Sequence, residues 1–339
     1  MNLYLESGYP NYDFINQYDS PFIMIIGPRG TGKTFLTKRI YQDYGCFLFV
    51  VRTKKKLEYN LNQITTPFKK LLPDCEIVAN DEMGIIYENE VAKEENRAFC
   101  LCVNINTFNN LTGVAFDDIT AVVFDEFTPQ KRDRPIKGEF QGYKNIMELV
   151  YRNNFDKKVK TFFFGNSNTM QSQIIIGYRL VKPLFEMYQN HETIRYIPEK
   201  LMTIVLLLDS PISKKKAMND FYRSIGRHNA EMELDNTFTD LSVDYVKHQN
   251  LKEYVPELIT PTFTLWGHKS KDIVYVTKYI KAGGCNELEN TPASLDYWQH
   301  ICKVYYNMYV KGLVYFASYD IQCDFLQSFS VENWNLILT

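Results

Sequence analysis

Residues 27–34 read Gly-Pro-Arg-Gly-Thr-Gly-Lys-Thr; they follow the apolar run 22–26 and precede a helical pattern that begins at Phe35. Glycines let the chain turn back on itself, so that successive backbone N–H groups and the next helix N-terminus face phosphate oxygens. In such a loop Lys33 reaches the β- and γ-phosphates, and Thr34 supplies a hydroxyl to Mg²⁺. A glycine-rich turn with a surface lysine is the alternative, but the flanking strand and helix favour nucleotide binding. The predicted site comprises Gly27, Pro28, Arg29, Gly30, Thr31, Gly32, Lys33 and Thr34.

Two adjacent carboxylates, Asp125 and Glu126, end the apolar run 121–124. At the carboxyl end of a strand that faces a phosphate-binding loop, Asp125 is expected to hold Mg²⁺ through water and Glu126 to polarise the attacking water. A solvated strand end is the plainer alternative. A further strand pattern at 46–51 lies between the two motifs, which indicates the extra-strand class of P-loop ATPase, in which the catalytic glutamate follows the aspartate. Kinases and small GTPases of this fold usually lack that glutamate.

Polar side chains flank the next apolar run, 161–164. Asn166 follows it and is expected to contact the γ-phosphate and the lytic water, although an Asn after a Gly is also an ordinary turn residue. Arg29 lies inside the glycine-rich loop, and Arg152 and Arg179 lie on either side of the run. A planar guanidinium offsets charge on a transferring phosphoryl group, whether it comes from the same chain or from a neighbour. Arg152 is therefore a candidate inter-subunit finger and Arg179 a weaker one, with solvated surface arginines as the alternative.

The composition describes a folded protein of two domains, or of one large domain with an appendage. Hydrophobic residues make up 45% of the 339 residues, and the net charge of −2 means that any nucleic-acid contact must come from a local basic patch. The seven cysteines are odd in number and mostly lie in apolar patterns, so they are expected to be reduced and free of metal. The sequence shows no leader pattern and no run long enough to cross a bilayer, which predicts a soluble, intracellular protein.

Strand and helix patterns alternate from about residue 20 to 210, which predicts an α/β domain with a parallel sheet and helices on its faces. A P-loop ATPase domain is expected over 1–208, a polar helical linker over 209–240 and a small α+β domain over 241–339. In the last domain we expect a hairpin around Gly267 and a helix that opens at Thr291 and stops before Gly312. The strands expected in the first domain are 22–26, 46–51, 75–78, 99–103, 121–124, 161–164 and 204–208.

Five segments carry a resemblance to a known family. They are 27–34 with its internal arginine, 51–54 (Val-Arg-Thr-Lys), 123–127 (Val-Phe-Asp-Glu-Phe), 151–153 (Tyr-Arg-Asn) and 231–236 (Glu-Met-Glu-Leu-Asp-Asn). Together they resemble the double-stranded DNA packaging ATPases of small short-tailed bacteriophages, which are relatives of terminase large subunits. The resemblance covers nearly the whole chain; its motifs are specific in combination, and the C-terminal match is one of pattern.

The resemblance implies a ring of ATPase subunits, with five expected, at the portal vertex of an empty capsid, where ATP and Mg²⁺ drive the genome inward. Its implied partners are double-stranded DNA, the portal and a structural RNA, in the host cytoplasm and transiently at the procapsid. By position, Arg152 matches the family's trans-acting arginine. Lys54 matches a lysine implicated in inter-subunit nucleotide contact, although the lysine run 54–56 would also suit a solvated face.

The resemblance further implies a C-terminal domain like ribonuclease H that has lost nuclease activity. Such nucleases hold two metal ions with carboxylates, one of them in the middle of the first strand. The run 261–266 offers no carboxylate, and Asp320 and Asp324, spaced to share a helix face, would have no partners. Nuclease activity is therefore not expected.

A translocating motor is expected to grip DNA through its phosphates, without sequence preference. Basic residues of the linker are candidates for this grip, alongside the run 54–56, and a solvated charged face is the alternative. The linker candidates are Lys214, Lys215, Lys216, Arg223 and Arg227. The leading hypothesis is a DNA-translocating ATPase, and the alternative is a nucleotide-dependent switch or scaffold with slow turnover that binds protein alone. A small-molecule kinase is disfavoured, because Glu126 is placed to activate water and no lid-like arginine run follows.

Overall fold

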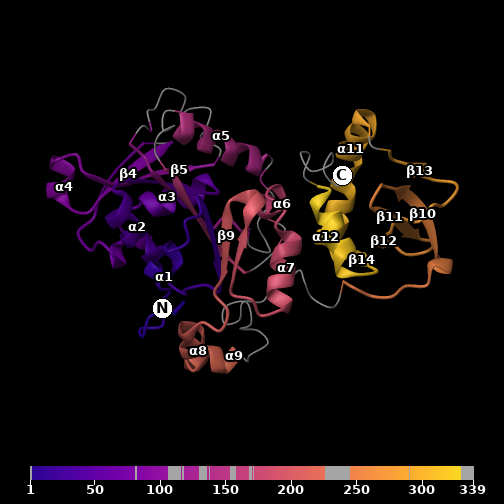
Figure 1. Ribbon diagram of the computed structural model, residues 1–339, viewed down its shortest axis with the longest axis horizontal. Helices are drawn as coiled ribbons and strands as arrows, with labels where there is room; N and C mark the ends of the chain where they lie inside the picture. The colour runs from indigo at the N-terminus through magenta and orange to yellow at the C-terminus, as the bar shows by residue number, and fades with distance from the viewer. Residues whose placement is uncertain are drawn as a thin grey trace. The chain divides into compact units, whose positions relative to one another are not determined.

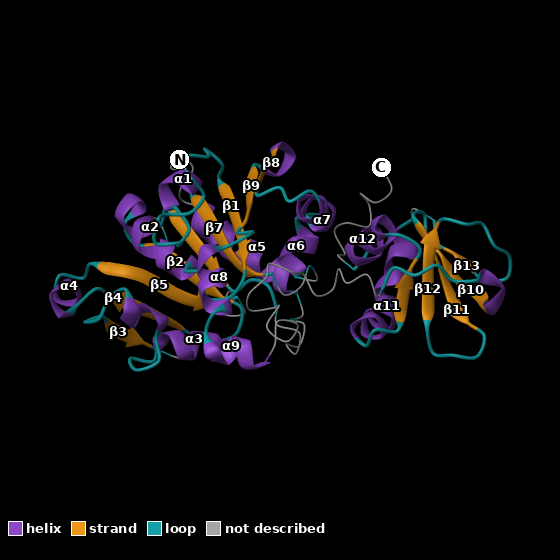
Figure 2. Cartoon of the chain, turned by 90° about the horizontal axis from the view of Figure 1, so that it is seen from below, coloured by secondary structure: helices purple, strands orange, loops and turns teal. Residues whose placement is uncertain are grey.

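The computed structural model divides the chain into two compact units, which are drawn in Figure 1 and Figure 2. The first unit contains residues 1–169 and 187–237, and the second contains 170–186 and 238–339. The sequence placed a boundary after residue 208, whereas the contacts group 209–237 with the first unit and 170–186 with the second. The residues that the structure describes are 2–80, 82–105, 116, 118–129, 136, 138–152, 158–167, 170, 172–225, 245–289 and 291–329.

A nine-stranded sheet forms the centre of the first unit, in the order β3-β4-β5-β2-β6-β7-β1-β9-β8. The strands are β1 (Phe22–Gly27), β2 (Phe47–Val51), β3 (Glu76–Ala79), β4 (Met83–Tyr87), β5 (Ala98–Asn104), β6 (Ala121–Asp125), β7 (Lys160–Asn166), β8 (Ile194–Ile197) and β9 (Met202–Leu206). The predicted parallel pairing is confirmed from β5 through β9, where continuous apolar runs are buried on both faces. Both edges differ: β4 is antiparallel to β3 and β5, and β8 is antiparallel to β9. The sequence missed β4 and β8 because short, partly exposed strands carry a weak apolar signal.

Helices cover the two faces of this sheet because alternate strand residues point in opposite directions. On one face, Ile25, Phe49 and Phe162 pack in a core cluster with Ile40 and Leu57 from the helices. On the opposite face, the ring of Tyr143 in α5 lies 6.0 Å from that of Phe124 and 5.5 Å from that of Phe163, between centroids. The helices of this unit are α1 (Tyr12–Asn16), α2 (Leu36–Tyr44), α3 (Lys54–Leu61), α4 (Glu90–Glu94), α5 (Glu139–Arg152), α8 (Pro211–Ala217) and α9 (Asp220–Ile225).

The strand order brings distant motifs to one edge of the sheet. β7 lies between β1 and β6, and its register pairs Asn166 with Gly27 and Phe164 with Asp125. Parallel strands end at the same edge, so the loop after β1, the carboxylates after β6 and Asn166 converge there. Arg52, the residue after β2, joins them because β2 pairs with β6.

The second unit has a five-stranded sheet in the order β13-β10-β11-β12-β14. Its core is aromatic: Phe263, Trp298, Phe316 and Phe325 are buried against one another, and Trp298 Nε1 donates to the Ser328 carbonyl at 2.8 Å. The predicted hairpin and helix are confirmed as β11–β12 and α11. The elements are α6 (Gln173–Gly177), β10 (Tyr254–Ile259), β11 (Phe263–His268), β12 (Val274–Lys278), β13 (Asn286–Glu287), α11 (Pro292–Val310), β14 (Val314–Phe316) and α12 (Tyr319–Gln327). Helix α7 (Val181–Gln189) also belongs to this unit up to residue 186, and its last three residues are grouped with the first unit.

The carboxylates of the second unit match the sequence expectation in part: Asp320 and Asp324 share a helix, but the first strand is not the one expected. The run 261–266 contributes the strand after β10, and β10 itself carries Glu257, whose Oε2 accepts a hydrogen bond from Tyr305 at 3.1 Å. Asp320 and Asp324 both lie on α12, and Asp320 Oδ1 lies 3.9 Å from Lys182 Nζ. Among the residues that the structure describes, no three or more His, Cys, Asp or Glu side chains gather closely enough to hold a metal ion.

All seven cysteines are free thiols. Within the described ranges, none of the helices combines the length and apolarity that crossing a membrane requires.

Candidate nucleotide-binding site

The glycine-rich loop between β1 and α2 has the conformation that its glycines allow. Gly30 and Gly32 have positive φ angles of 68° and 90°, a region that other residues avoid. Lys33 is buried, and its Nζ donates to the carbonyls of Gly27 and Pro28, each at 2.9 Å. Thr31 Oγ1 also donates to the Pro28 carbonyl, at 3.0 Å. The loop thus curls around its own lysine, which is the group predicted to meet the phosphates.

A buried lysine and a half-buried aspartate of opposite charge lie next to this loop. The pKa of Lys33 is lowered to about 7, mainly because the side chain is buried. The carboxylates of Asp125 and Glu126 act to raise this pKa, and the charges of Lys216 and Arg29 act to lower it. The pKa of Asp125 is raised to about 7, mainly by burial and also by the charge of Glu126. The charges of Lys33 and Lys56 act to lower it. Such opposed shifts in one place are typical of functional sites, because a structural core avoids burying charge.

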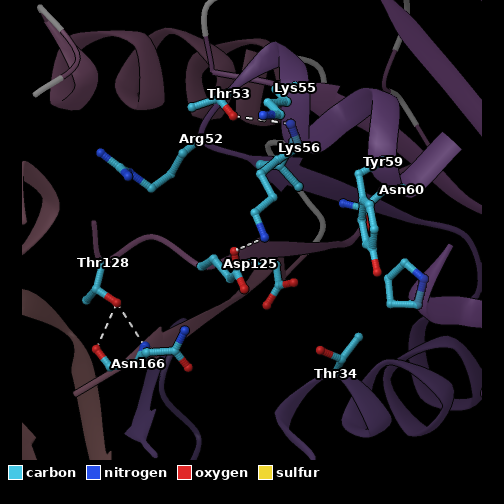
Figure 3. Close-up of a pocket in the computed structure, with 13 residues that line it drawn as sticks. Thr34, Arg52, Thr53, Lys55, Lys56, Tyr59, Asn60, Asp125, Thr128 and Asn166 are labelled. Atoms are coloured by element: carbon cyan, nitrogen blue, oxygen red, sulfur yellow. Dashed lines mark hydrogen bonds and ion pairs between the residues drawn. The ribbon is translucent and has the colours of Figure 1, made fainter. Parts of the chain in front are cut away.

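A cavity of about 530 Å³ opens beside the strand ends (Figure 3). Its size falls in the range of small-molecule pockets. Asp125 and Glu126 line it from the end of β6, Asn166 from β7 and Thr34 from the start of the helical turn after the loop. Of the sequence-predicted catalytic residues, Asp125, Glu126 and Asn166 share this cavity, whereas Lys33 and Arg152 do not line it. The remaining lining residues are Val51, Arg52, Thr53, Lys55, Lys56, Tyr59, Asn60, Pro67 and Thr128.

Glu126 is held by a lysine that the sequence analysis did not single out. Its backbone is left-handed, with φ 49°, and its Oε2 lies 2.6 Å from Lys56 Nζ. Figure 3 shows Lys56 reaching from α3 toward the carboxylates at the strand end. Thr53 caps α3 by accepting from the Lys56 N–H at 3.2 Å, so the helix begins at a fixed place. Lys56 is consequently the lysine that contacts the candidate general base, and the inter-subunit contact expected of Lys54 stays a prediction.

Asn166 is fixed by a neighbour on the β6 side. Its backbone N–H donates to Thr128 Oγ1 at 2.8 Å, and Thr128 Oγ1 donates to the Asn166 carbonyl, also at 2.8 Å. Asn166 is buried with an exposed fraction of 5%, and it lines the cavity. Figure 3 shows Thr128 and Asn166 side by side. This arrangement fixes the backbone that carries the predicted γ-phosphate contact.

A buried ion pair connects the cavity to α5. Arg52 Nε lies 2.5 Å from Glu139 Oε1, and the two side chains are only 5% and 2% exposed. Arg52 also lines the cavity, whereas Glu139 is the first residue of α5. The pair anchors the helix that ends at Arg152 to the end of β2.

The predicted arginine finger does not reach the cavity of its own chain. Arg152 is 57% exposed, and its Nη2 lies 3.1 Å from Glu148 Oε1 on the same helix. Arg179 belongs to the second unit and has a left-handed backbone with φ 59°. Neither arginine lines the cavity beside the strand ends.

The three linker lysines lie in three different environments. Lys214 Nζ lies 3.5 Å from Asp209 Oδ1, and Lys215 is exposed. Lys216 is half-buried and donates to the backbone carbonyl of Arg29 in the glycine-rich loop. Arg223 lies 3.7 Å from Asp220, and Arg227 lies outside the described residues.

The N-terminal segment also contacts the loop, which the sequence did not indicate. A Cβ atom on Gly32 would collide with the ring of Tyr9, and Tyr9 packs on Phe35 with 5.4 Å between ring centroids. Both aromatic side chains remain partly exposed, at 37% and 41%. Position 32 thus requires glycine for packing as well as for backbone conformation.

The donor set near the loop fits Mg²⁺. A hydroxyl on Thr34 and a carboxylate on Asp125 line the same cavity, and hard oxygen donors are the ligands that Mg²⁺ prefers. Thr34 and Asp125 are also the two residues that the sequence predicted as Mg²⁺ ligands.

Comparisons with solved structures give the same picture of the fold. The structure of the Phi-28 gp11 DNA packaging motor matches with a TM-score of 0.60 and 15% identity, over 97% of this chain and 97% of that one. The bacteriophage Phi-29 viral genome packaging motor assembly matches with a TM-score of 0.53 and 16% identity, over 97% of this chain and 100% of that one. The chain shares its fold with these motor proteins. The resemblance predicted from the sequence is thereby confirmed at the level of the fold, and no family model or curated protein matches the sequence.

Proposed function

We propose that the chain is an ATPase subunit of a viral motor that translocates double-stranded DNA into a preformed capsid. One observation carries this proposal: the glycine-rich loop, Asp125, Glu126 and Asn166 converge at one edge of a sheet in which β7 separates β1 from β6. That strand order supports the extra-strand class of P-loop ATPase. Two solved structures that share this fold are of packaging motors, which supports DNA as the substrate that is moved.

The proposed chemistry assigns one task to each group. Lys33 leaves the carbonyls of its own loop and binds the β- and γ-phosphates of ATP. Glu126 orients and polarises the attacking water, and Asn166 contacts the γ-phosphate from the neighbouring strand. Mg²⁺, held by Thr34 and by Asp125 through water, would neutralise charge on the phosphates. The Lys56–Glu126 ion pair must open, or share Glu126 with the water, before hydrolysis.

We further propose that the subunits form a ring, with five expected, in the host cytoplasm and transiently at the procapsid portal, where a structural RNA is a further candidate partner. The exposed Arg152 supports a ring, because an arginine that cannot reach its own cavity can serve a neighbour's. Lys54, exposed at the start of α3, remains a candidate for contact with a neighbour's nucleotide. The second unit is proposed to resemble ribonuclease H without nuclease activity.

The alternative is a nucleotide-dependent switch or scaffold that hydrolyses ATP slowly and binds protein alone. The Lys56–Glu126 ion pair favours slow basal turnover in either case, so basal activity does not separate the two. Duplex DNA separates them. For a motor, ATP hydrolysis rises when duplex DNA is added, and plasmid incubated with the protein and Mg²⁺ or Mn²⁺ stays uncut. Turnover that ignores DNA, together with no DNA binding in the presence of a non-hydrolysable ATP analogue, would favour the switch.

A further inference from the structure

Lys216 lies against the nucleotide loop, unlike its neighbours on α8. Its ammonium donates to the Arg29 carbonyl, and a Cβ atom placed on Gly30 would collide with Lys216 Nζ. Lys214, two residues earlier, points to Asp209 and is 70% exposed. A helix turns by about 200° over two residues, so only one of the two can face the loop.

Other contacts hold α8 in this position. Tyr4 donates its hydroxyl proton to the Leu208 carbonyl at 2.7 Å, just before the helix. A Cβ atom on Gly8 would lie 3.1 Å from Pro211 Cβ, which shows that the N-terminal segment packs closely on the start of α8. The next residue, Tyr9, packs on Gly32 and Phe35. The N-terminal segment is therefore fitted between α8 and the loop, so the place of Lys216 does not depend on its own hydrogen bond.

Two ammonium groups thus share one short stretch of backbone. Lys33 donates to the carbonyls of residues 27 and 28, and Lys216 donates to that of residue 29. Like charges this close repel each other: the charge of Lys216 lowers the pKa of Lys33, while the carboxylates of Asp125 and Glu126 act in the opposite direction. Phosphate oxygens form stronger, charge-assisted hydrogen bonds with ammonium groups, and a polyphosphate carries enough negative charge for both. The arrangement is therefore suited to a polyphosphate.

We propose that Lys216 is a further nucleotide-binding residue, which exchanges the Arg29 carbonyl for a phosphate oxygen of the bound nucleoside triphosphate. This inference rests on the proposed function of the loop. It gives Lys216 a different role from the DNA contact expected for the lysine run 214–216.

The test is the affinity for Mg²⁺ and a non-hydrolysable ATP analogue, measured by calorimetry on the full chain. Lys216→Ala and Lys216→Gln should each weaken binding by about tenfold, the effect of one charge-assisted hydrogen bond, and Lys216→Arg should restore most of it. Lys38→Ala, which removes an exposed lysine from α2, controls for a general loss of positive charge near the loop. Its affinity should stay within about twofold of wild type, by the small effect expected of an exposed charge.

Three outcomes would overturn the inference. Affinities of Lys216→Ala and Lys216→Gln equal to wild type, while Lys33→Ala abolishes binding, would reject it and leave the proposed function intact. An equal loss in Lys38→Ala would show that only net charge matters. Failure of the wild-type chain to bind any nucleotide would reject the proposed function as well. Lys216→Gln keeps the test decisive if the alanine variant fails to fold.

Discussion

The first unit buries an ion pair at the end of a parallel strand, whereas the Lys182–Asp320 pair of the second unit lies at the surface. Arg52 and Glu139 are 5% and 2% exposed, but Lys182 and Asp320 of the second unit are 56% and 65% exposed. Burying a charge is costly unless partners or ligands offset the loss of water. From this contrast we expect the chemistry in the first unit.

Arg152 tests this contrast most strongly, because it belongs to the first unit and is exposed. We expect Arg152→Ala to lower the turnover of the assembled motor by about 10³-fold or more, as loss of an arginine finger does. Mixing Arg152→Ala chains with Lys33→Ala chains should restore part of the activity, since each subunit supplies what its neighbour lacks.

The ion-pair partner of Arg152 provides the matched control. Glu148→Ala breaks the same surface contact without removing the guanidinium, so its turnover should stay near wild type. No rescue at any mixing ratio, or an equal loss in Glu148→Ala, would show that Arg152 is structural.

The buried pair should respond more strongly than its exposed counterpart. Glu139→Gln leaves the Arg52 guanidinium buried without a negative partner, which should destabilise the first unit by about 3–5 kcal/mol. Asp320→Asn removes the exposed partner of Lys182 and should cost about 1 kcal/mol or less. Both changes in the free energy of unfolding are measured by urea unfolding of each variant, with a spectroscopic signal that reports on the unit that carries the substitution. Similar losses of unfolding free energy in the two variants would contradict the difference expected between the buried and the exposed ion pair.

The sequence predicted the parts of the site that are local along the chain. Each of the loop 27–34, Asp125–Glu126 and Asn166 follows an apolar strand, and strand ends of a parallel sheet meet at one edge. Lys56 was missed because the choice among residues 54–56 depends on where α3 begins, and two residues turn a helix by about 200°. Glu139 was missed because its partner, Arg52, is 87 residues away in the sequence.

In the second unit, too, one element could not be predicted from the sequence pattern. Its first strand, β10, contains Pro256, and a proline within a run weakens the evidence for a strand. The structure accommodates it with an irregular register between Pro256 and Leu258. Glu257 was overlooked for that reason, and the apolar run of β11 was treated as the first strand.

The smallest expected effect concerns DNA. Lys214 and Lys215 are exposed on α8 and remain candidates for contact with DNA phosphates. Replacing one phosphate-contacting lysine by alanine should lower the slope of log affinity against log salt by about one unit. Lys252→Ala, an exposed lysine of the second unit, is the control and should leave the slope unchanged. Slopes for Lys214→Ala and Lys215→Ala that match wild type would exclude both lysines from the DNA contact.

The central claim is that Glu126, at the end of β6, is the group that activates water for ATP hydrolysis. Glu126→Gln should bind Mg²⁺ and ATP about as well as wild type, because the phosphate contacts are made by the loop. Its kcat in the presence of duplex DNA should fall by about 10²–10⁴-fold, as expected for loss of a general base. Wild-type kcat in Glu126→Gln, with unchanged nucleotide affinity, would contradict the account and assign the catalytic base to another carboxylate.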